Sequence, residues 1–493
     1  MARTVARTAA LATVRPMAVP VPVAARTVAR TVARMVARTV ARMVAPTVAR
    51  TVAPAAAPDA RRMTQVDAAV GTGTDTGTGP RRRPALARLV ARPDDFAADI
   101  WGREALLTPA ADLPHTFDDL FSQAAVDDLV SVQGLRTPFL RVAKDGTTLP
   151  DRDFTLGGGV GAAVGDQVSD DRLLRLFADG ATMVLQGLHR THAPILRFSQ
   201  ALAADLGHPV QVNAYVTPPQ NKGFSDHYDV HDVFVLQIHG SKQWRVHEPV
   251  HPMPLRDQPW TDRRAAVQQA AAEPPTLDAV LEPGDCLYLP RGYLHAATAL
   301  GEVSTHLTIG VHTWTRHALA DEVLRTALAD LAADPVVRTS LPLGADVADP
   351  ADLAEHLDLV RDRLAAAVAR VEDTTVAAAM RGRARAAQRA APVRPLEQLA
   401  AVAQLQPGTE LVLREHLSAE IEITTAGVRL RSRAGLLYLR PGEVAGVQRL
   451  LGWGRVSVTD LGGAGEGGGP GDGPGDGAEL ARRLLHHGVA VVG

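Results

Sequence analysis

Residues 223–246, GFSDHYDVHDVFVLQIHGSKQWRV, decide the fold of this chain. Residues 230–238 are mostly β-branched, aromatic or aliphatic, which predicts a buried strand, and Gly240-Ser241 predicts a turn into a second strand. His227 and Asp229 are two residues apart, so they lie on one face of an extended chain. An imidazole beside a carboxylate makes two thirds of the 2-His-1-carboxylate triad of non-haem Fe(II) oxygenases. This stretch therefore predicts two ligands of an iron site.

The third ligand is expected from a distant strand, and His295 is the candidate. It lies in residues 282–299, EPGDCLYLPRGYLHAATA, where Pro283-Gly284-Asp285 and Pro290-Arg291-Gly292 are turn signals around a short apolar strand, residues 286–289. This arrangement of turn, strand and turn can deliver His295, which follows it, to the interior of a barrel. The predicted metal ligands are thus His227, Asp229 and His295.

The order of these motifs resembles the cupin/JmjC fold, and GFSDHYDVHDVFVLQIHGSKQW with PRGYLH resembles the JmjC-type ribosomal oxygenases, most strongly over residues 213–314. The resemblance implies an α+β chain: a double-stranded β-helix (jelly roll) with flanking helices, a helical dimerisation region and a C-terminal winged-helix-like domain. It also implies an Fe(II)- and 2-oxoglutarate-dependent dioxygenase that uses dioxygen to hydroxylate a protein side chain. A ribosomal protein is the candidate substrate, and a homodimer is the expected assembly.

Lys242 is the candidate for binding the co-substrate. A dicarboxylate that chelates iron at one end needs a cation for its far carboxylate, and the resembled family places a Lys or Arg at this distance after the first histidine ligand. Asn213 and Tyr215 match an N-x-Y pair that lies beside the co-substrate in that family. The family often has a hydroxyl near the end of the strand predicted over residues 304–310. The aligned position here is Gly310, which leaves Thr308 as the substitute.

The role of His231 is open, because it shares the predicted strand face with His227 and Asp229. As a fourth ligand it would indicate a cupin metalloenzyme, an isomerase or dioxygenase acting on a small molecule without 2-oxoglutarate. Lys242 would then have no role. In the resembled family the corresponding histidine is not a ligand, which favours a position beside the ligands. A third hypothesis, a non-catalytic binding module, has no need of three converging metal ligands.

Length and composition limit the number of domains, the partners and the location that we expect. A chain of 493 residues predicts roughly three domains. A net charge of −2 gives no overall case for nucleic acid or membrane as a partner, and no run of about 20 apolar residues predicts a membrane span. The single cysteine, Cys286, excludes an intramolecular disulfide and suits a reducing compartment, so a cytoplasmic location is expected.

Residues 1–62 consist of repeated Val-Ala-Arg-Thr and Val-Ala-Arg-Met units, without an acidic residue before Asp59. Three interpretations are open: an arginine-rich arm for nucleic acid, a transit-type peptide, or a low-complexity extension ahead of Met63. Residues 71–80, GTGTDTGTGP, predict a flexible linker. We therefore assign residues 1–83 to a disordered extension and linker.

The rest of the chain is divided by pattern into three parts. Residues 84–316 are the predicted catalytic domain, with a helical turn at residues 96–100, helices at 117–129, 170–178 and 192–206, and strands at 181–186 and 210–217. Residues 317–394 are the predicted helical dimerisation region. Residues 395–493 are the predicted winged-helix-like domain, with helices 396–405 and 442–451, a hairpin over 420–439 and a disordered insert at 462–477. It shows no basic recognition helix, which argues against specific DNA binding.

Overall fold

The computed structural model describes residues 82–144, 146–222, 224–462 and 477–493. The predicted N-terminal arm and its linker, and residues 463–476 of the predicted disordered insert, lie outside these ranges. None of the described helices is long and apolar enough to cross a membrane.

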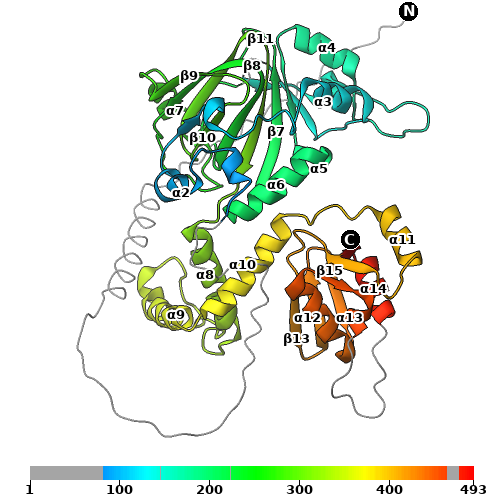
Figure 1. Cartoon of the computed structure of the whole chain (residues 1–493). Coiled ribbons are helices and arrows are strands. Elements are labelled where there is room, and N and C mark those ends of the chain that lie inside the picture. The colour runs from blue at the N-terminus through cyan, green and yellow to red at the C-terminus, as the bar shows by residue number, and fades with distance from the viewer. Residues whose placement is uncertain (1–81, 145, 223, 463–476) are drawn as a thin grey trace, which may run out of the picture. The chain divides into compact units, whose positions relative to one another are not determined.

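The main element of the described residues is a nine-stranded antiparallel sheet with the strand order β1-β10-β8-β11-β7-β6-β2-β3 and with β9 paired to β8 (Figure 1). Its strands are β1 (Leu106–Thr108), β2 (Leu140–Lys144), β3 (Thr147–Thr148), β6 (Thr182–Leu185), β7 (Val210–Thr217), β8 (Asp232–His247), β9 (Leu277–Leu281), β10 (Cys286–Leu289) and β11 (Leu294–Val311). The residues of β8 from Val233 to Leu236 are all buried, which explains why the pattern there is a continuous apolar run.

The structure differs from the sequence prediction at Gly240, where β8 continues instead of turning. β8 pairs with β11 along almost its whole length, with register shifts between Leu300 and His306. Gly240 has a φ of 61°, and a Cβ there would lie 2.3 Å from the carbonyl oxygen of Val303. Only glycine permits this close approach, so the predicted turn is an irregularity within one long strand.

Helices cover the sheet beside β7, where Figure 1 shows α5 and α6. The helices of this part are α2 (Pro93–Asp95), α3 (Gln123–Asp127), α4 (Asp170–Ala178), α5 (Leu188–Thr191), α6 (Ala193–Leu206) and α7 (Arg264–Ala270). α4 begins where the Ser169 side chain accepts a hydrogen bond from the Arg172 N–H, and α6 ends at Gly207 with φ 70°. α3 begins later than predicted, because Ser122 caps it.

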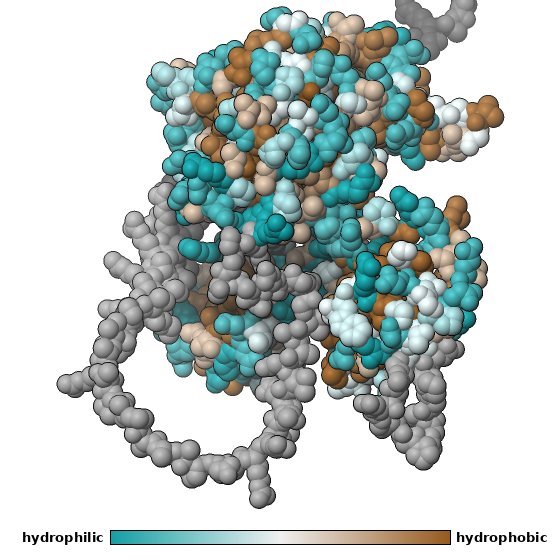
Figure 2. All heavy atoms as spheres, viewed as in Figure 1, coloured by the Kyte–Doolittle hydropathy of each residue, from teal (hydrophilic) through white to brown (hydrophobic). Residues whose placement is uncertain are grey.

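The sheet-containing segment presents hydrophobic and hydrophilic residues mixed over its visible face (Figure 2). Its buried core includes Phe96, which packs its ring against Trp101, Phe234 and Tyr288 at centroid distances of 4.8–5.9 Å. The aromatic helical turn predicted near residue 96 is therefore part of the core behind β8.

The remaining described residues form a helical segment and a mixed C-terminal segment. The first contains α8 (Arg316–Ala333), α9 (Pro350–Ala369) and α10 (Asp373–Ala387). The second contains α11 (Pro395–Ala403), β12 (Glu410–Leu413), β13 (Glu420–Thr424), β14 (Gly427–Ser432), β15 (Gly435–Leu439), α12 (Val444–Trp453), β16 (Arg455–Ser457), α13 (Val458–Gly462), α14 (Gly477–His486) and β17 (Ala490–Val492). The predicted hairpin is a three-stranded meander, β13-β14-β15, because Gly427 and Gly435 each permit a tight turn at positive φ.

Candidate metal centre

The three predicted metal ligands come together in space. One ligand atom each of His227, Asp229 and His295 lies within 4.8 Å of the other two. His227 and Asp229 precede β8, whereas His295 is the second residue of β11. A pair of backbone hydrogen bonds joins His227 to His295, from the His295 N–H to the His227 carbonyl at 2.8 Å and in return at 3.2 Å. This bridge fixes the separation of the two rings.

Both imidazoles are oriented by the chain itself. His227 Nδ1 lies 2.7 Å from the carbonyl oxygen of Ser225, and His295 Nδ1 lies 3.1 Å from the carbonyl oxygen of Tyr293. A carbonyl can only accept a hydrogen bond, so each Nδ1 carries the proton and each Nε2 presents a lone pair. This is the tautomer that a histidine ligand needs, and it is held before any metal binds.

The charges of the centre favour the metal-binding protonation states. Burial, followed by the neighbouring His227, lowers the pKa of His295 to about 4, so this ring is neutral near pH 7. At Asp229, burial raises the pKa, but the neighbouring His231, His227 and His295 side chains and Arg141 outweigh it, and the pKa of this carboxyl is below its usual value. A neutral His295 and an ionised Asp229 are thus available together.

A small cavity of about 60 Å³ opens onto these ligands and contains Lys242. Lys242 is 3% exposed, and its Nζ donates a hydrogen bond to Thr217 Oγ1 at 3.1 Å. No carboxylate of the described residues pairs with it. Burial lowers its pKa to about 7, because a charged ammonium is poorly stabilised away from water. A buried cation without a counter-ion is the arrangement that a bound carboxylate would complete.

Tyr215 and Thr308 line the same cavity, whereas Asn213 is not among its lining residues. Asn213 Oδ1 instead accepts a hydrogen bond from the Gly187 N–H at 3.1 Å. Tyr215 stacks on His306 with ring centroids 5.0 Å apart, and burial raises the pKa of its hydroxyl to about 12. In this structure Asn213 holds the segment before α5, and Tyr215 and Thr308 face the cavity.

His231 lies beside the centre but outside the group of described residues that could hold a metal. Its ring contacts His312 edge to face at 5.3 Å. A Cβ added to Gly310 would lie 3.0 Å from His231 Cε1, so glycine at this position leaves room for the imidazole. The absence of a hydroxyl at Gly310 therefore has a packing reason.

Two side chains beside the site were missed by the sequence analysis. Thr217 continues the alternation of Asn213 and Tyr215 along β7, and this spacing could have identified it as the partner of Lys242. Arg141 lies in β2, with its guanidinium 5.3 Å from the centroid of Phe224 and a buried Nε that has no hydrogen-bond partner among the described residues. Its charge helps to lower the pKa of Asp229. An arginine in a short strand carries no sequence signal for this position.

Comparisons with known proteins agree with the motifs. Residues 189–319 match the family model of the JmjC domain. Human ribosomal oxygenase 1 is 33% identical over 230 residues, which cover 45% of this chain and 33% of that protein. A bifunctional lysine-specific demethylase and histidyl-hydroxylase NO66 of Drosophila erecta is 29% identical over 259 residues, 51% of this chain and 37% of that protein. The chain thus spans about a third of the length of these curated relatives.

Among solved structures, Escherichia coli ycfD aligns over 82% of this chain and 99% of its own, with a TM-score of 0.48 and 17% identity. The matched domain contains all three candidate ligands, Lys242 and the remaining predicted site residues. The family match confirms the predicted cupin/JmjC fold for this part of the chain, and the relatives confirm the resemblance to ribosomal oxygenases.

Proposed function

We propose that this chain, which carries a JmjC domain over residues 189–319, is an Fe(II)- and 2-oxoglutarate-dependent oxygenase that hydroxylates a protein side chain. The observation that carries the proposal is a buried lysine without a counter-ion in the same cavity as two histidines and an aspartate whose ligand atoms converge. A metalloenzyme that used no dicarboxylate would have no need of Lys242.

The residues fit Fe(II). His227, Asp229 and His295 would hold it on one face through two imidazole nitrogens and one carboxylate oxygen, and the rest of the coordination sphere would stay open. The hydrogen bonds from each Nδ1 to a backbone carbonyl keep both rings in place while the open positions are used. His231, the fourth ligand of the alternative hypothesis, is turned toward His312.

The residues also fit 2-oxoglutarate. Lys242 would donate to its far carboxylate, and the Thr217 hydroxyl, which already accepts from Lys242, would hold the ammonium in position. Tyr215 and Thr308 would border the bound molecule within the cavity. Iron and 2-oxoglutarate, when bound, would supply the activation of dioxygen, with one oxygen atom going into the succinate formed alongside carbon dioxide and the other into a C–H bond of the substrate.

The substrate we propose is a ribosomal protein, because the relatives are named ribosomal oxygenase 1 and histidyl-hydroxylase. The test is mass spectrometry of ribosomal proteins from cells with and without this enzyme. We expect one protein that gains the mass of one oxygen atom only when the enzyme is present. Ribosomal proteins of unchanged mass, together with 2-oxoglutarate binding by the purified protein, would reject this substrate class and keep the oxygenase. The proposal includes a cytoplasmic location, in which ribosomes would be accessible to the enzyme.

We further propose that residues 317–394 form a homodimer interface and that residues 395–493 are a winged-helix-like domain without specific DNA binding. Several large apolar side chains of α8 and α9 are exposed in the single chain: Leu324, Leu328, Leu357, Leu359 and Val360. Exposed apolar side chains gathered on one face are typical of an interface that a partner covers. Leu324 and Leu328 are four residues apart on α8, and Leu357 and Val360 are three apart on α9, so each pair lies on one helix face, which supports a helix-on-helix contact with a second copy.

The dimer is tested by replacing Leu324 and Leu328 with glutamate, which favours helix but cannot be buried without a partner charge. Light scattering should report a mass of two chains for the parent protein and of one chain for the double variant. Leu174→Glu is the matched control, because Leu174 is an exposed leucine on another helix, α4. A double variant that keeps the parent mass would exclude α8 from the interface.

A further inference from the structure

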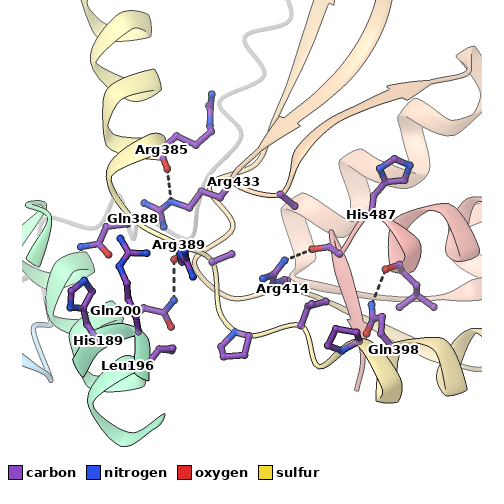
Figure 3. A pocket seen from close by; sticks show the side chains of 18 of the residues that line it. His189, Leu196, Gln200, Arg385, Gln388, Arg389, Gln398, Arg414, Arg433 and His487 are labelled. Atoms are coloured by element: carbon purple, nitrogen blue, oxygen red, sulfur yellow. Dashed lines mark hydrogen bonds between the residues drawn. The ribbon is translucent and has the colours of Figure 1, made fainter. Parts of the chain in front are cut away.

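A second cavity, separate from the metal centre, is bordered by α5, α6, the segment between α10 and α11, and C-terminal residues (Figure 3). All of its lining residues belong to the same unit of the chain, residues 69–493. Its volume of about 950 Å³ is at the upper end of the roughly 300–1,000 Å³ that is typical of ligand-binding pockets. None of the metal ligands and neither Lys242 nor Tyr215 lines it.

The lining of this cavity is strongly cationic. Five arginines contribute to it, Arg190, Arg385, Arg389, Arg414 and Arg433, and no aspartate or glutamate is among the described lining residues. Of these five, only Arg385 forms an ion pair within the described residues, with Glu420. Burial, followed by the charge of Arg389, lowers the pKa of Arg190, so these two guanidinium groups are close enough to repel each other. Four positive charges therefore lack a carboxylate partner among the described residues.

Two of these arginines are fixed in place by the backbone. Arg414 donates from Nε to the Ala391 carbonyl at 2.6 Å and from Nη1 to the Gly488 carbonyl at 3.1 Å. Arg433 donates to the carbonyl oxygens of Arg385, His416 and Ala384. These contacts tie the chain together, but a guanidinium has five N–H donors, so each arginine keeps donors that no described residue accepts.

The other two are free to meet a ligand. Arg190 and Arg389 are exposed, and within the described part of the chain neither guanidinium forms a hydrogen bond or an ion pair. The backbone at Arg389 is nevertheless held, since its carbonyl accepts from Gln200 Nε2 at 3.0 Å, as Figure 3 shows. The cavity thus combines two anchored and two unpaired guanidinium groups.

We propose that this cavity binds a ligand through several adjacent phosphate groups. Guanidinium groups bind phosphate oxygens by paired, charge-assisted hydrogen bonds, and an anion would relieve the repulsion between the arginines. No phenylalanine, tyrosine or tryptophan is among the described lining residues, so the only rings that could stack on a base there are the imidazoles of His189, His486 and His487. The five arginines outnumber these rings, and recognition therefore falls chiefly on the phosphates, which either a nucleoside polyphosphate or the backbone of single-stranded RNA would supply.

The test compares full-length, iron-free proteins. The cavity variant is Arg190→Glu with Arg389→Glu, and the control is Arg316→Glu with Arg338→Glu, which changes the net charge equally at two exposed arginines outside the cavity. All three proteins keep the arginine-rich residues 1–62, so any binding by that segment is common to them. The probes are inorganic tripolyphosphate, measured by calorimetry, and a labelled oligouridylate, measured by fluorescence anisotropy.

We expect the cavity variant to bind tripolyphosphate at least about tenfold more weakly than the parent, and the control to differ by less than about twofold. For oligouridylate, each lost phosphate contact should reduce the slope of log affinity against log salt by about 0.7. If the parent protein binds oligouridylate more tightly than tripolyphosphate, and tripolyphosphate displaces it, the ligand is the RNA backbone. If the parent protein binds tripolyphosphate more tightly than oligouridylate, the ligand is a nucleoside polyphosphate. An equal loss in both variants, no binding by the parent, or tighter binding of poly-glutamate would overturn the proposal. None of these readouts depends on the oxygenase activity.

Discussion

Replacement of Asp229 by alanine should abolish iron binding and 2-oxoglutarate turnover together. The remaining His227 and His295 are neutral ligands, so the variant would leave the charge of Fe(II) uncompensated in a site built for one carboxylate. Loss of a residue that merely orients a ligand costs about 10- to 100-fold in metal affinity or activity, and loss of the ligand itself should exceed that. Metal content after anaerobic loading with Fe(II), and succinate formation, are the two measurements.

Asp257→Ala is the matched control, because Asp257 is an exposed aspartate in a loop away from the cavity. We expect it to bind iron and turn over like the parent protein. A thermal midpoint of Asp229→Ala close to that of the parent separates loss of metal from loss of fold. Turnover retained in this variant would remove Asp229 from the ligand set.

Replacement of Lys242 by alanine should weaken 2-oxoglutarate binding by about 10- to 150-fold while iron binding stays nearly unchanged. A charge-assisted hydrogen bond to a carboxylate contributes roughly 1.5–3 kcal/mol, and each ~1.4 kcal/mol is a factor of ten in affinity. Lys242 touches Thr217 and not the metal ligands, so the two affinities should separate. The measurement is a pair of titrations, with Fe(II) on the metal-free protein and with 2-oxoglutarate on the iron-loaded protein.

Lys144→Ala is the matched control for these titrations. Lys144 pairs with Asp179 at the surface, and its loss should change 2-oxoglutarate affinity by less than about twofold.

Because the pKa of Lys242 is about 7, its protonated fraction falls as the pH rises through 7. Parent affinity should therefore be roughly tenfold weaker at pH 8 than at pH 6, whereas Lys242→Ala should lose this dependence. Equal affinities in the parent and in Lys242→Ala would reject the role of this lysine, and a parent protein that binds no 2-oxoglutarate would favour the cupin alternative.

Many helices and strands could be predicted from local sequence patterns, because the formation of these elements depends on neighbouring residues alone. The helix at 170–178 and the strands at 210–217 and 286–289 have the bounds that spacing and turn residues predicted. The continuous strand through Gly240 was missed, because its cause is the carbonyl of Val303, far along the chain. The third strand of residues 420–439 was missed for a different reason: the glycine turns at Gly427 and Gly435 are local, but the pattern was interpreted as a single hairpin.

The sequence by itself determined the chemistry of the centre: His227 and Asp229 are two residues apart, and His295 follows a turn, so their types and spacing are visible in the chain. Only the tertiary structure decided which side chains surround them. The burial of Lys242 against Thr217, the approach of Arg141 and the gathering of arginines in the second cavity all depend on pairings between distant segments. A residue's type fixes its charge and hydrogen-bonding groups, but burial and counter-ions are set by the whole fold, and these decide what the charge can bind.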